Sequence, residues 1–97
     1  MRRERALAIL AAHRQELRER FGVKSLRLFG SVARDEASER SDVDVIVDFD
    51  ATPSLFGFLS LQGYLRDLLG TKVDLVTETG LKERARRYVE KDAVNVA

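Results

Sequence analysis

Leu28-Phe29-Gly30-Ser31, followed ten residues later by Asp42-Val43-Asp44, is the part of the sequence that decides the fold. In the first stretch an apolar strand runs into a Gly-Ser turn. In the second, a new apolar strand opens with two carboxylates that stand one residue apart. A glycine turn that leads into a helix suits a phosphate, and paired carboxylates suit a divalent metal ion. The combination suggests nucleotidyl transfer.

The sequence around these stretches predicts alternating helices and strands. Gly22 and Gly70 suit positions just past helix ends, while Thr52 and Pro53 suit the N-cap and the first residue of a helix. The expected elements are a helix over 2–20, a strand over 23–29, a short helix over 31–37, a strand over 43–49, a helix over 54–69, a strand over 72–77, a basic helix over 80–91 and a short strand over 92–96. This order predicts a single α/β (α+β) domain over residues 1–97, in which helices flank a small mixed sheet.

The composition narrows the possible chemistry. Seventeen Lys and Arg residues nearly balance sixteen Asp and Glu residues, and a net charge of +1 is not typical of a dedicated nucleic-acid binder. The chain has no cysteine and one histidine, His13, so any metal ion needs oxygen ligands, which favours magnesium, manganese or calcium. No apolar run is long enough to span a bilayer and no apolar signal core follows Met1, so we expect a cytoplasmic protein.

Gly30 and Ser31 are the candidate phosphate-binding residues. A glycine lets the backbone approach a ligand closely, and the first N–H groups of the following helix have no partner within that helix. These N–H groups lie at the positive end of the helix dipole, and Ser31 adds a hydroxyl. Taken alone, Gly-Ser is also a common turn that binds nothing.

Asp42 and Asp44 lie two residues apart on a predicted strand, so their side chains project on the same side. Val43, Val45 and Val47 then face the opposite way, into the core. Two carboxylates held side by side repel each other unless a cation lies between them, which suggests a metal site. Taken alone, the pair also fits the solvated start of a strand.

Asp74 interrupts the otherwise apolar segment Lys72-Val73-Asp74-Leu75-Val76. A charge in such a segment is costly unless it is paired or bound to a metal ion. Neighbouring strands would bring Asp74 beside Asp42 and Asp44, and three converging carboxylates suit two magnesium ions. Taken alone, Asp74 also fits an edge strand whose charge faces water.

Together these residues resemble the signature of the nucleotidyltransferase superfamily with the DNA polymerase β-like fold. That signature is Gly-Ser, a spacer, Asp-x-Asp and a later strand carboxylate. The sequence around the motif is similar to that of the minimal nucleotidyltransferases in particular, the MntA-type antitoxins that are encoded with HEPN-domain toxins. The stretches that carry this resemblance are Phe29-Gly30-Ser31-Val32-Ala33-Arg34 and Ser41-Asp42-Val43-Asp44-Val45. The resemblance covers nearly the whole chain.

The resemblance implies a role for each matching residue. Asp42 and Asp44 would bind magnesium that carries the triphosphate of ATP, and Asp74 would complete a second metal site and help activate the attacking hydroxyl. Gly30 and Ser31 would hold the β- and γ-phosphates. The implied reaction is in-line attack on the α-phosphorus, with transfer of AMP and release of pyrophosphate.

The resemblance also implies the acceptor, a tyrosine of a cognate HEPN ribonuclease toxin, so that the chain is an antitoxin that works as a protein adenylyltransferase. Since no acceptor-binding domain is expected after the catalytic fold, a partner protein would supply the acceptor. Two alternatives stay open: nucleotidyl transfer to a small molecule or RNA, and a non-catalytic antitoxin that blocks the toxin sterically. The near-neutral charge argues against RNA, and the three intact carboxylates argue against a steric blocker.

Other residues carry weaker indications. Arg34 follows Ser31 by three residues, so a helix would place it on the same face, toward the phosphates. The helix over 54–69 is apolar nearly all round, and its surplus apolar surface predicts an interface with the toxin or with a second copy of the chain. The residues of this helix expected to pack on the sheet are Leu55, Phe58, Leu59, Leu65 and Leu69. The basic residues expected on the helix over 80–91 are Lys82, Arg84, Arg86 and Arg87.

Overall fold

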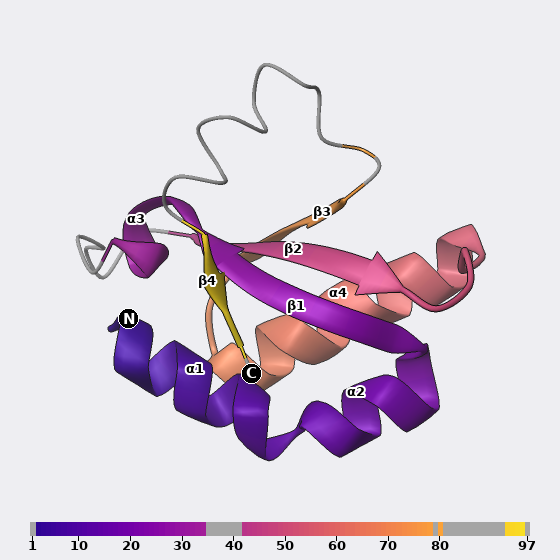
Figure 1. Cartoon of the computed structure of the whole chain (residues 1–97), viewed down its shortest axis with the longest axis horizontal. Coiled ribbons are helices and arrows are strands. Elements are labelled where there is room, and N and C mark those ends of the chain that lie inside the picture. The colour runs from indigo at the N-terminus through magenta and orange to yellow at the C-terminus, as the bar shows by residue number, and fades with distance from the viewer. Residues whose placement is uncertain (1, 35–41, 79, 81–92, 97) are drawn as a thin grey trace.

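A computed structural model of the chain describes residues 2–34, 42–78, 80 and 93–96, whose arrangement is drawn in Figure 1. In chain order the elements are α1 (Arg3–Ala12), α2 (Arg14–Phe21), β1 (Val23–Phe29), α3 (Gly30–Ala33), β2 (Val43–Phe49), α4 (Leu55–Leu69), β3 (Val73–Thr77) and β4 (Val94–Asn95). Among these elements no helix is both long and apolar enough to cross a membrane.

The four strands form one sheet in the order β3-β2-β1-β4. β1 runs antiparallel to both of its neighbours, whereas β2 and β3 are parallel and are joined by the α4 crossover. Figure 1 shows α1, α2 and α4 on one face of the sheet, and α3 at the end where β1 stops and β2 begins. The structure therefore confirms the predicted mixed sheet flanked by helices.

The core lies between the sheet and the three longer helices. Val43, Val45 and Val47 of β2 are completely buried, which confirms that these alternate side chains face the core. Leu10 of α1 and Leu65 of α4 are also fully buried and pack into the same cluster. Burial of each such side chain contributes roughly 1.5–3 kcal/mol, so this layer supplies the main driving force for folding.

The predicted helix over 2–20 is interrupted at His13, which separates α1 from α2. The His13 N–H donates to the carbonyl of Leu10 at 3.2 Å, one residue short of the α-helical partner Ile9. The carbonyl of Ile9 instead lies 2.8 Å from Nδ1 of the His13 ring, which donates when it carries the proton. The His13 ring thus takes the place of its own backbone N–H at the Ile9 carbonyl, and α1 ends there.

The two helix ends that were predicted at glycines are confirmed. Gly22 and Gly70 end α2 and α4 in the left-handed region, each at φ 68°.

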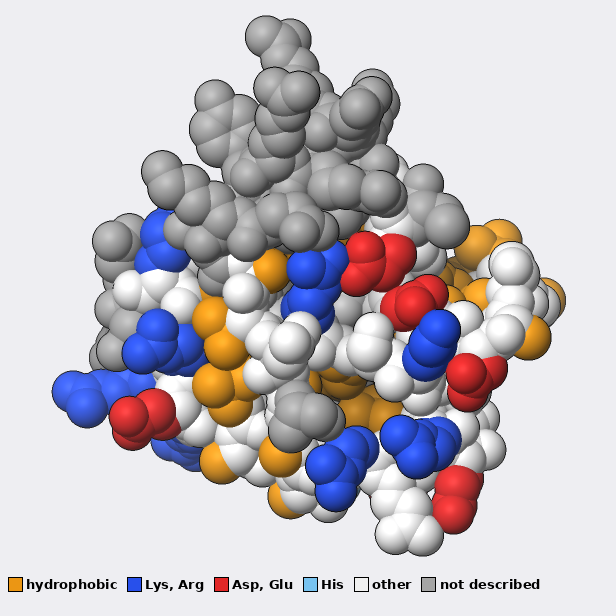
Figure 2. Space-filling model, viewed as in Figure 1, with side chains coloured by type: hydrophobic (Ala, Val, Ile, Leu, Met, Phe, Trp, Pro, Cys, Tyr) orange, Lys and Arg blue, Asp and Glu red, His pale blue; other side chains and the backbone are white. Residues whose placement is uncertain are grey.

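Helix α4 differs from its prediction in its N-terminus and in its buried face. Ser54 is the N-cap, because its hydroxyl accepts from the Gly57 N–H at 3.1 Å, so the prediction of Thr52 as cap was wrong. The fully or nearly fully buried residues are Leu61, Leu65 and Leu69. Leu55, Phe56 and Leu59 are 72%, 83% and 51% exposed, which corrects the expectation that Leu55 and Leu59 pack on the sheet. Figure 2 shows apolar side chains exposed at the end of the molecule where α4 begins.

The remaining differences concern element ends. β3 begins at Val73 rather than at residue 72, and β4 covers only Val94–Asn95 of the predicted strand over 92–96. α3 is a single turn over Gly30–Ala33, and residues 35–37 of the predicted short helix lie outside the described residues. The same holds for most of the predicted helix over 80–91, including its four basic residues.

Candidate active site

The turn between β1 and α3 depends on Gly30. Gly30 has φ 71°, a left-handed conformation that glycine adopts without the steric cost of a side chain. A Cβ placed on Gly30 would collide with the carboxylate oxygen Oδ2 of Asp44. Val32 and Ala33 bury α3 in the core, so the turn cannot easily move away from that carboxylate. Glycine is therefore required both by the backbone angle and by the close approach to Asp44.

The strand register places Asp44 and Asp74 directly opposite each other. They are paired residues of the parallel strands β2 and β3, and Phe29 at the end of β1 is the antiparallel partner of Asp44. Paired residues project from the same face of a sheet, and this face is the one opposite the buried valines. Asp44 is half-buried and Asp74 is exposed. Two of the three predicted carboxylates thus lie side by side at one end of the sheet, next to the Gly30 turn.

The environment of Asp44 disfavours its charge. Partial burial, followed by the negative charges of Asp74 and Asp42, raises the pKa of the Asp44 carboxyl to about 6, while the Arg34 guanidinium opposes the shift. A bound cation would remove this conflict because it would neutralise the repulsion between the carboxylates. The arrangement therefore suits a positively charged ligand.

Asp42 lies at the margin of the carboxylate pair. It immediately precedes β2, its side chain is 44% exposed, and its Oδ2 forms an ion pair with Nζ of Lys72 at 3.9 Å. In the part of the chain that the structure describes, no three Asp, Glu, His or Cys side chains stand close enough together to be a ready-made metal cage. Of the three predicted carboxylates, Asp44 and Asp74 are therefore paired across the strands. Asp42 lies beside them and forms its ion pair with Lys72.

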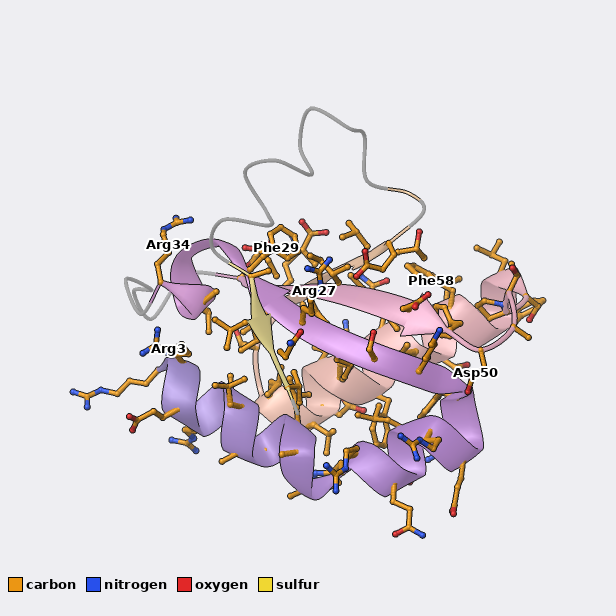
Figure 3. All side chains as sticks on the ribbon, viewed as in Figure 1. Arg3, Arg27, Phe29, Arg34, Asp50 and Phe58 are labelled. Atoms are coloured by element: carbon orange, nitrogen blue, oxygen red, sulfur yellow. The ribbon has the colours of Figure 1, made fainter. Side chains whose placement is uncertain are left out.

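Arg34 lies at the C-terminal end of α3, and Arg3 reaches the same end from α1 (Figure 3). The Arg34 N–H donates to the carbonyl of Gly30 at 3.2 Å and closes the turn, and its guanidinium lowers the pKa of Asp44, as expected for a cation on this side of the sheet. Arg3 donates from Nη1 to the carbonyl of Ala33 at 3.2 Å and so ties α1 to the end of α3. Sequence reasoning missed Arg3, because nothing in the sequence links residues thirty positions apart. The placement of the Ser31 hydroxyl is not described, and its role stays a prediction.

The carboxylate face of the sheet continues beyond Asp44. Arg27 forms a salt bridge with Glu78 at 2.6 Å, and Ile46, the register partner of Arg27, is only 1% exposed. Phe29 and Arg27 project from β1 on this face (Figure 3). Leu26 and Leu28 of β1 are buried in the core, so the alternation of the strand indicates that Arg27 and Phe29 project from the opposite face.

Comparisons with known proteins agree on one family. A family model described as a nucleotidyltransferase domain matches residues 10–96. The protein adenylyltransferase MntA of Thermococcus cleftensis is 51% identical over 89 residues, which cover 92% of this chain and 90% of that protein. A solved structure of a proposed minimal nucleotidyltransferase superposes with a TM-score of 0.80 at 39% identity and covers 97% of this chain and 95% of that one.

Two toxin–antitoxin structures share the fold at lower identity. A toxin–antitoxin complex with AMP-PNP superposes with a TM-score of 0.74 at 20% identity, covering 90% of this chain and 72% of that one. A complex of a tri-AMPylated Shewanella oneidensis HEPN toxin with an MNT antitoxin superposes with a TM-score of 0.67 at 18% identity, covering 94% and 71%. At these identities the likeness shows the fold.

Proposed function

Because the chain belongs to the nucleotidyltransferase domain family, we propose that it is a protein adenylyltransferase that transfers AMP from ATP to a tyrosine of a HEPN ribonuclease toxin and so acts as an antitoxin. The observation that carries this proposal is the register pairing of Asp44 with Asp74 beside the Gly30 turn. The similarity to the protein adenylyltransferase MntA supports a protein acceptor. The shared fold with an antitoxin bound to an AMPylated HEPN toxin supports the class of partner.

The residues present fit magnesium. The candidate donors are carboxylate oxygens, which magnesium prefers. Burial first, and then the negative charges of Asp74 and Asp42, raise the pKa of Asp44, and a cation would stabilise the charged form against both effects. Asp42, Asp44 and Asp74 would hold the metal, with two ions expected. Bound magnesium would supply neutralisation of the charge on the triphosphate and on the departing pyrophosphate.

Gly30, Ser31 and Arg34 would hold the triphosphate. The absence of a Cβ at Gly30 leaves the backbone of the turn against the Asp44 carboxylate, so a phosphate bound at the turn lies beside the metal ligands. Arg34 adds a positive charge on the same side, as its effect on Asp44 indicates. Positioning of the α-phosphorus for attack accounts for much of the rate enhancement in such a reaction.

The transfer step exchanges one phosphorus–oxygen bond for another. The tyrosine oxygen attacks the α-phosphorus of ATP and forms the new bond, while the bond from the α-phosphorus to the oxygen that bridges to the β-phosphorus breaks. Its electron pair leaves with pyrophosphate. Asp74 is exposed at the edge of the site, so its carboxylate is available to take the phenol proton from the acceptor.

The experiment uses ATP labelled at the α-phosphate, magnesium, this protein and the product of the adjacent gene. We expect the label on that product, and we expect the Asp44→Asn variant to transfer it far more slowly. Asp67→Asn, a neutralised exposed carboxylate on α4, is the matched control and should transfer normally. If no label is transferred, while Asp42→Ala combined with Asp44→Ala still neutralises the toxin, the protein is a steric blocker. Label on RNA or a small molecule instead would assign the other acceptor class.

A further inference from the structure

The outer face of α4 is apolar where a surface helix is usually polar. Phe56 is 83% exposed, and its apolar neighbours Leu55 and Leu59 are exposed as well. Successive residues of a helix are about 100° apart, so Phe56 lies on the side of α4 that faces away from the buried Leu61 and Leu65. Packing on the sheet therefore does not account for the three exposed side chains. Neighbouring exposed apolar residues of this kind are typical of an interface.

Gly63 leaves a gap on the same side of this helix. It follows Phe56 by seven residues, and residues seven apart on a helix differ in direction by only about 20°. A Cβ on Gly63 would point into open space. Glycine weakens the interior of a helix, and at Gly63 neither a left-handed backbone angle nor a crowded Cβ position requires it. The close approach of another molecule is a physical reason for a glycine at this position.

A groove beside Gly63 has room for an aromatic ring. Its volume is 220 Å³, and an apolar cavity of about 150 Å³ holds a benzene molecule. Gln62 is already bonded within the chain, because it donates to the carbonyl of Val73 at 3.2 Å. Leu59 adds exposed apolar surface to the groove. The residues that line the groove are Leu59, Gln62, Gly63, Arg66, Lys72 and Val73.

We propose that a second copy of this chain covers the outer face of α4, with the two α4 helices antiparallel and Phe56 of each copy in the Gly63 groove of the other. A two-fold interface is self-complementary, so one contact of Phe56 with Gly63 generates the second. The axis passes near Leu59 and Ser60, which lie midway between the two positions. The missing side chain at Gly63 lets the helix axes approach to the short end of the usual range of about 8–10 Å.

The charges at the two ends of α4 favour the antiparallel arrangement. It brings the end that carries the exposed Arg66 toward the start of α4 in the other copy, and the exposed Asp50 lies in the connection that leads to that start. The two Arg66 residues stay about 20 Å apart along the helices, at about 1.5 Å per residue. The helix dipoles also oppose each other, which is favourable. Lys72, which lines the groove, pairs with Asp42 in its own chain.

The location of the surface favours a second copy over the acceptor protein. α4 lies on the helix face of the sheet, whereas Asp44 and Asp74 project from the opposite face (Figure 1). An acceptor has to reach those carboxylates, so it does not need the outer face of α4. A pair of chains joined through α4 therefore keeps both carboxylate faces open. The inference does not rest on the proposed function.

The first test measures the mass of the purified chain against its concentration by sedimentation equilibrium. One pair of 15-residue helices is smaller than a standard interface of about 1,600 Å², so we expect a weak dimer with a Kd of about 10–100 µM. Phe56→Ala removes the ring, and Gly63→Leu fills the groove that receives it. Each should raise the Kd at least about tenfold. A chain that stays monomeric up to about 1 mM overturns the proposal.

Gly63→Leu separates a fitted contact from general apolar association. It adds apolar surface and removes a glycine that weakens the helix, so association driven by apolar area alone should become tighter. Ala8→Leu adds a similar side chain on the exposed side of α1, and as the matched control it should leave the Kd unchanged. Circular dichroism and thermal unfolding show whether each variant is folded. A folded Gly63→Leu chain that dimerises as tightly as the wild type overturns the proposal.

The second test mixes the two variants. In a mixed pair, Phe56 of the Gly63→Leu chain meets the intact Gly63 of the other, and the side chain added by Gly63→Leu meets the one shortened by Phe56→Ala. Both contacts are then filled without a clash, so the variants should bind each other at least about fivefold more tightly than either binds itself. Fluorescence anisotropy with one variant labelled measures this difference. A mixed pair that is no tighter overturns the proposed contact.

Neither test uses ATP or the product of the adjacent gene, so their outcome does not decide the proposed function. The same variants show whether that product occupies the surface instead. If the wild-type chain is monomeric alone, and Phe56→Ala and Gly63→Leu weaken its binding to that product, the outer face of α4 belongs to the other partner. That result overturns the proposal and leaves the transfer of AMP to be judged by the labelling experiment.

Discussion

The two faces of β2 perform different tasks with alternate residues of one strand. On one face Val43, Val45 and Val47 are completely buried against the helices. On the other face, Asp44 is half-buried beside Asp74, and its charged form destabilises the folded state. The period of two in a strand permits this division, because neighbouring residues point to opposite faces of the sheet. Substitutions on one face should therefore affect stability, and substitutions on the other should affect the reaction.

The largest expected effect is on the chemical face. Asp44→Asn should reduce the rate of AMP transfer by roughly a thousandfold or more, because it removes the carboxylate proposed as the central metal ligand while it keeps the size of the side chain. Transfer is measured with α-labelled ATP at saturating magnesium. A loss smaller than tenfold would mean that Asp44 is not a ligand in the reaction.

Gly30→Ala tests the contact between the turn and this face. Its expected effect is about a hundredfold loss of AMP transfer, because a methyl group pushes Asp44 or the turn out of place, and a loss of roughly 1–2 kcal/mol of stability from the left-handed backbone. Gly22→Ala is the matched control, since Gly22 has nearly the same φ but nothing within 4 Å of its Cβ position. Equal activity losses in the two variants would remove the special role of the Gly30–Asp44 contact.

Val45→Ala tests the core face. Truncation of this fully buried side chain should lower the free energy of unfolding by about 2–3 kcal/mol, measured by urea denaturation. The kcat and KM at temperatures far below the unfolding transition should stay close to those of the wild type. A large change in kcat with intact stability would contradict the separation of the two faces.

The smallest effect concerns the stability cost of Asp44. A carboxyl whose pKa rises to about 6 on folding favours the folded state in its neutral form, so metal-free protein should lose stability as the pH rises from about 4 through 6. Asp44→Asn should therefore be more stable than the wild type by roughly 1–2 kcal/mol at pH 7.5, allowing for solvent around a half-buried group, and no more stable at pH 4. Thermal unfolding in EDTA measures this difference. Magnesium should raise the Tm of the wild type and leave the Asn variant unchanged.

Local patterns were enough to predict the strands and the face of β2 from which Asp44 projects. The alternation in Val43–Phe49 predicted the burial of Val43, Val45 and Val47 but not that of Ile46 on the other face, and the glycines at 22 and 70 predicted two helix ends. Interactions between distant segments were not predictable in the same way. The face of α4 that packs on the sheet depends on the position of the sheet, since the helix carries more than one apolar stripe. The contact of Arg3 with Ala33 and the ion pair of Asp42 with Lys72 likewise join elements whose approach no sequence pattern specifies.

The crossover that joins β2 to β3 also determines when the protein acquires its site. The pairing contacts between β2 and β3, with Asp44 and Asp74 among them, join residues far apart in the sequence, whereas the turns of α1 and α4 form from neighbours. Closing such long connections costs chain entropy before the parallel pairing repays it, so these contacts form late. A chain in which β3 has not yet docked has helices and a hairpin but no carboxylate pair. Enzymatic turnover is therefore a readout of completed folding, and during refolding it should never run ahead of the recovery of helical structure.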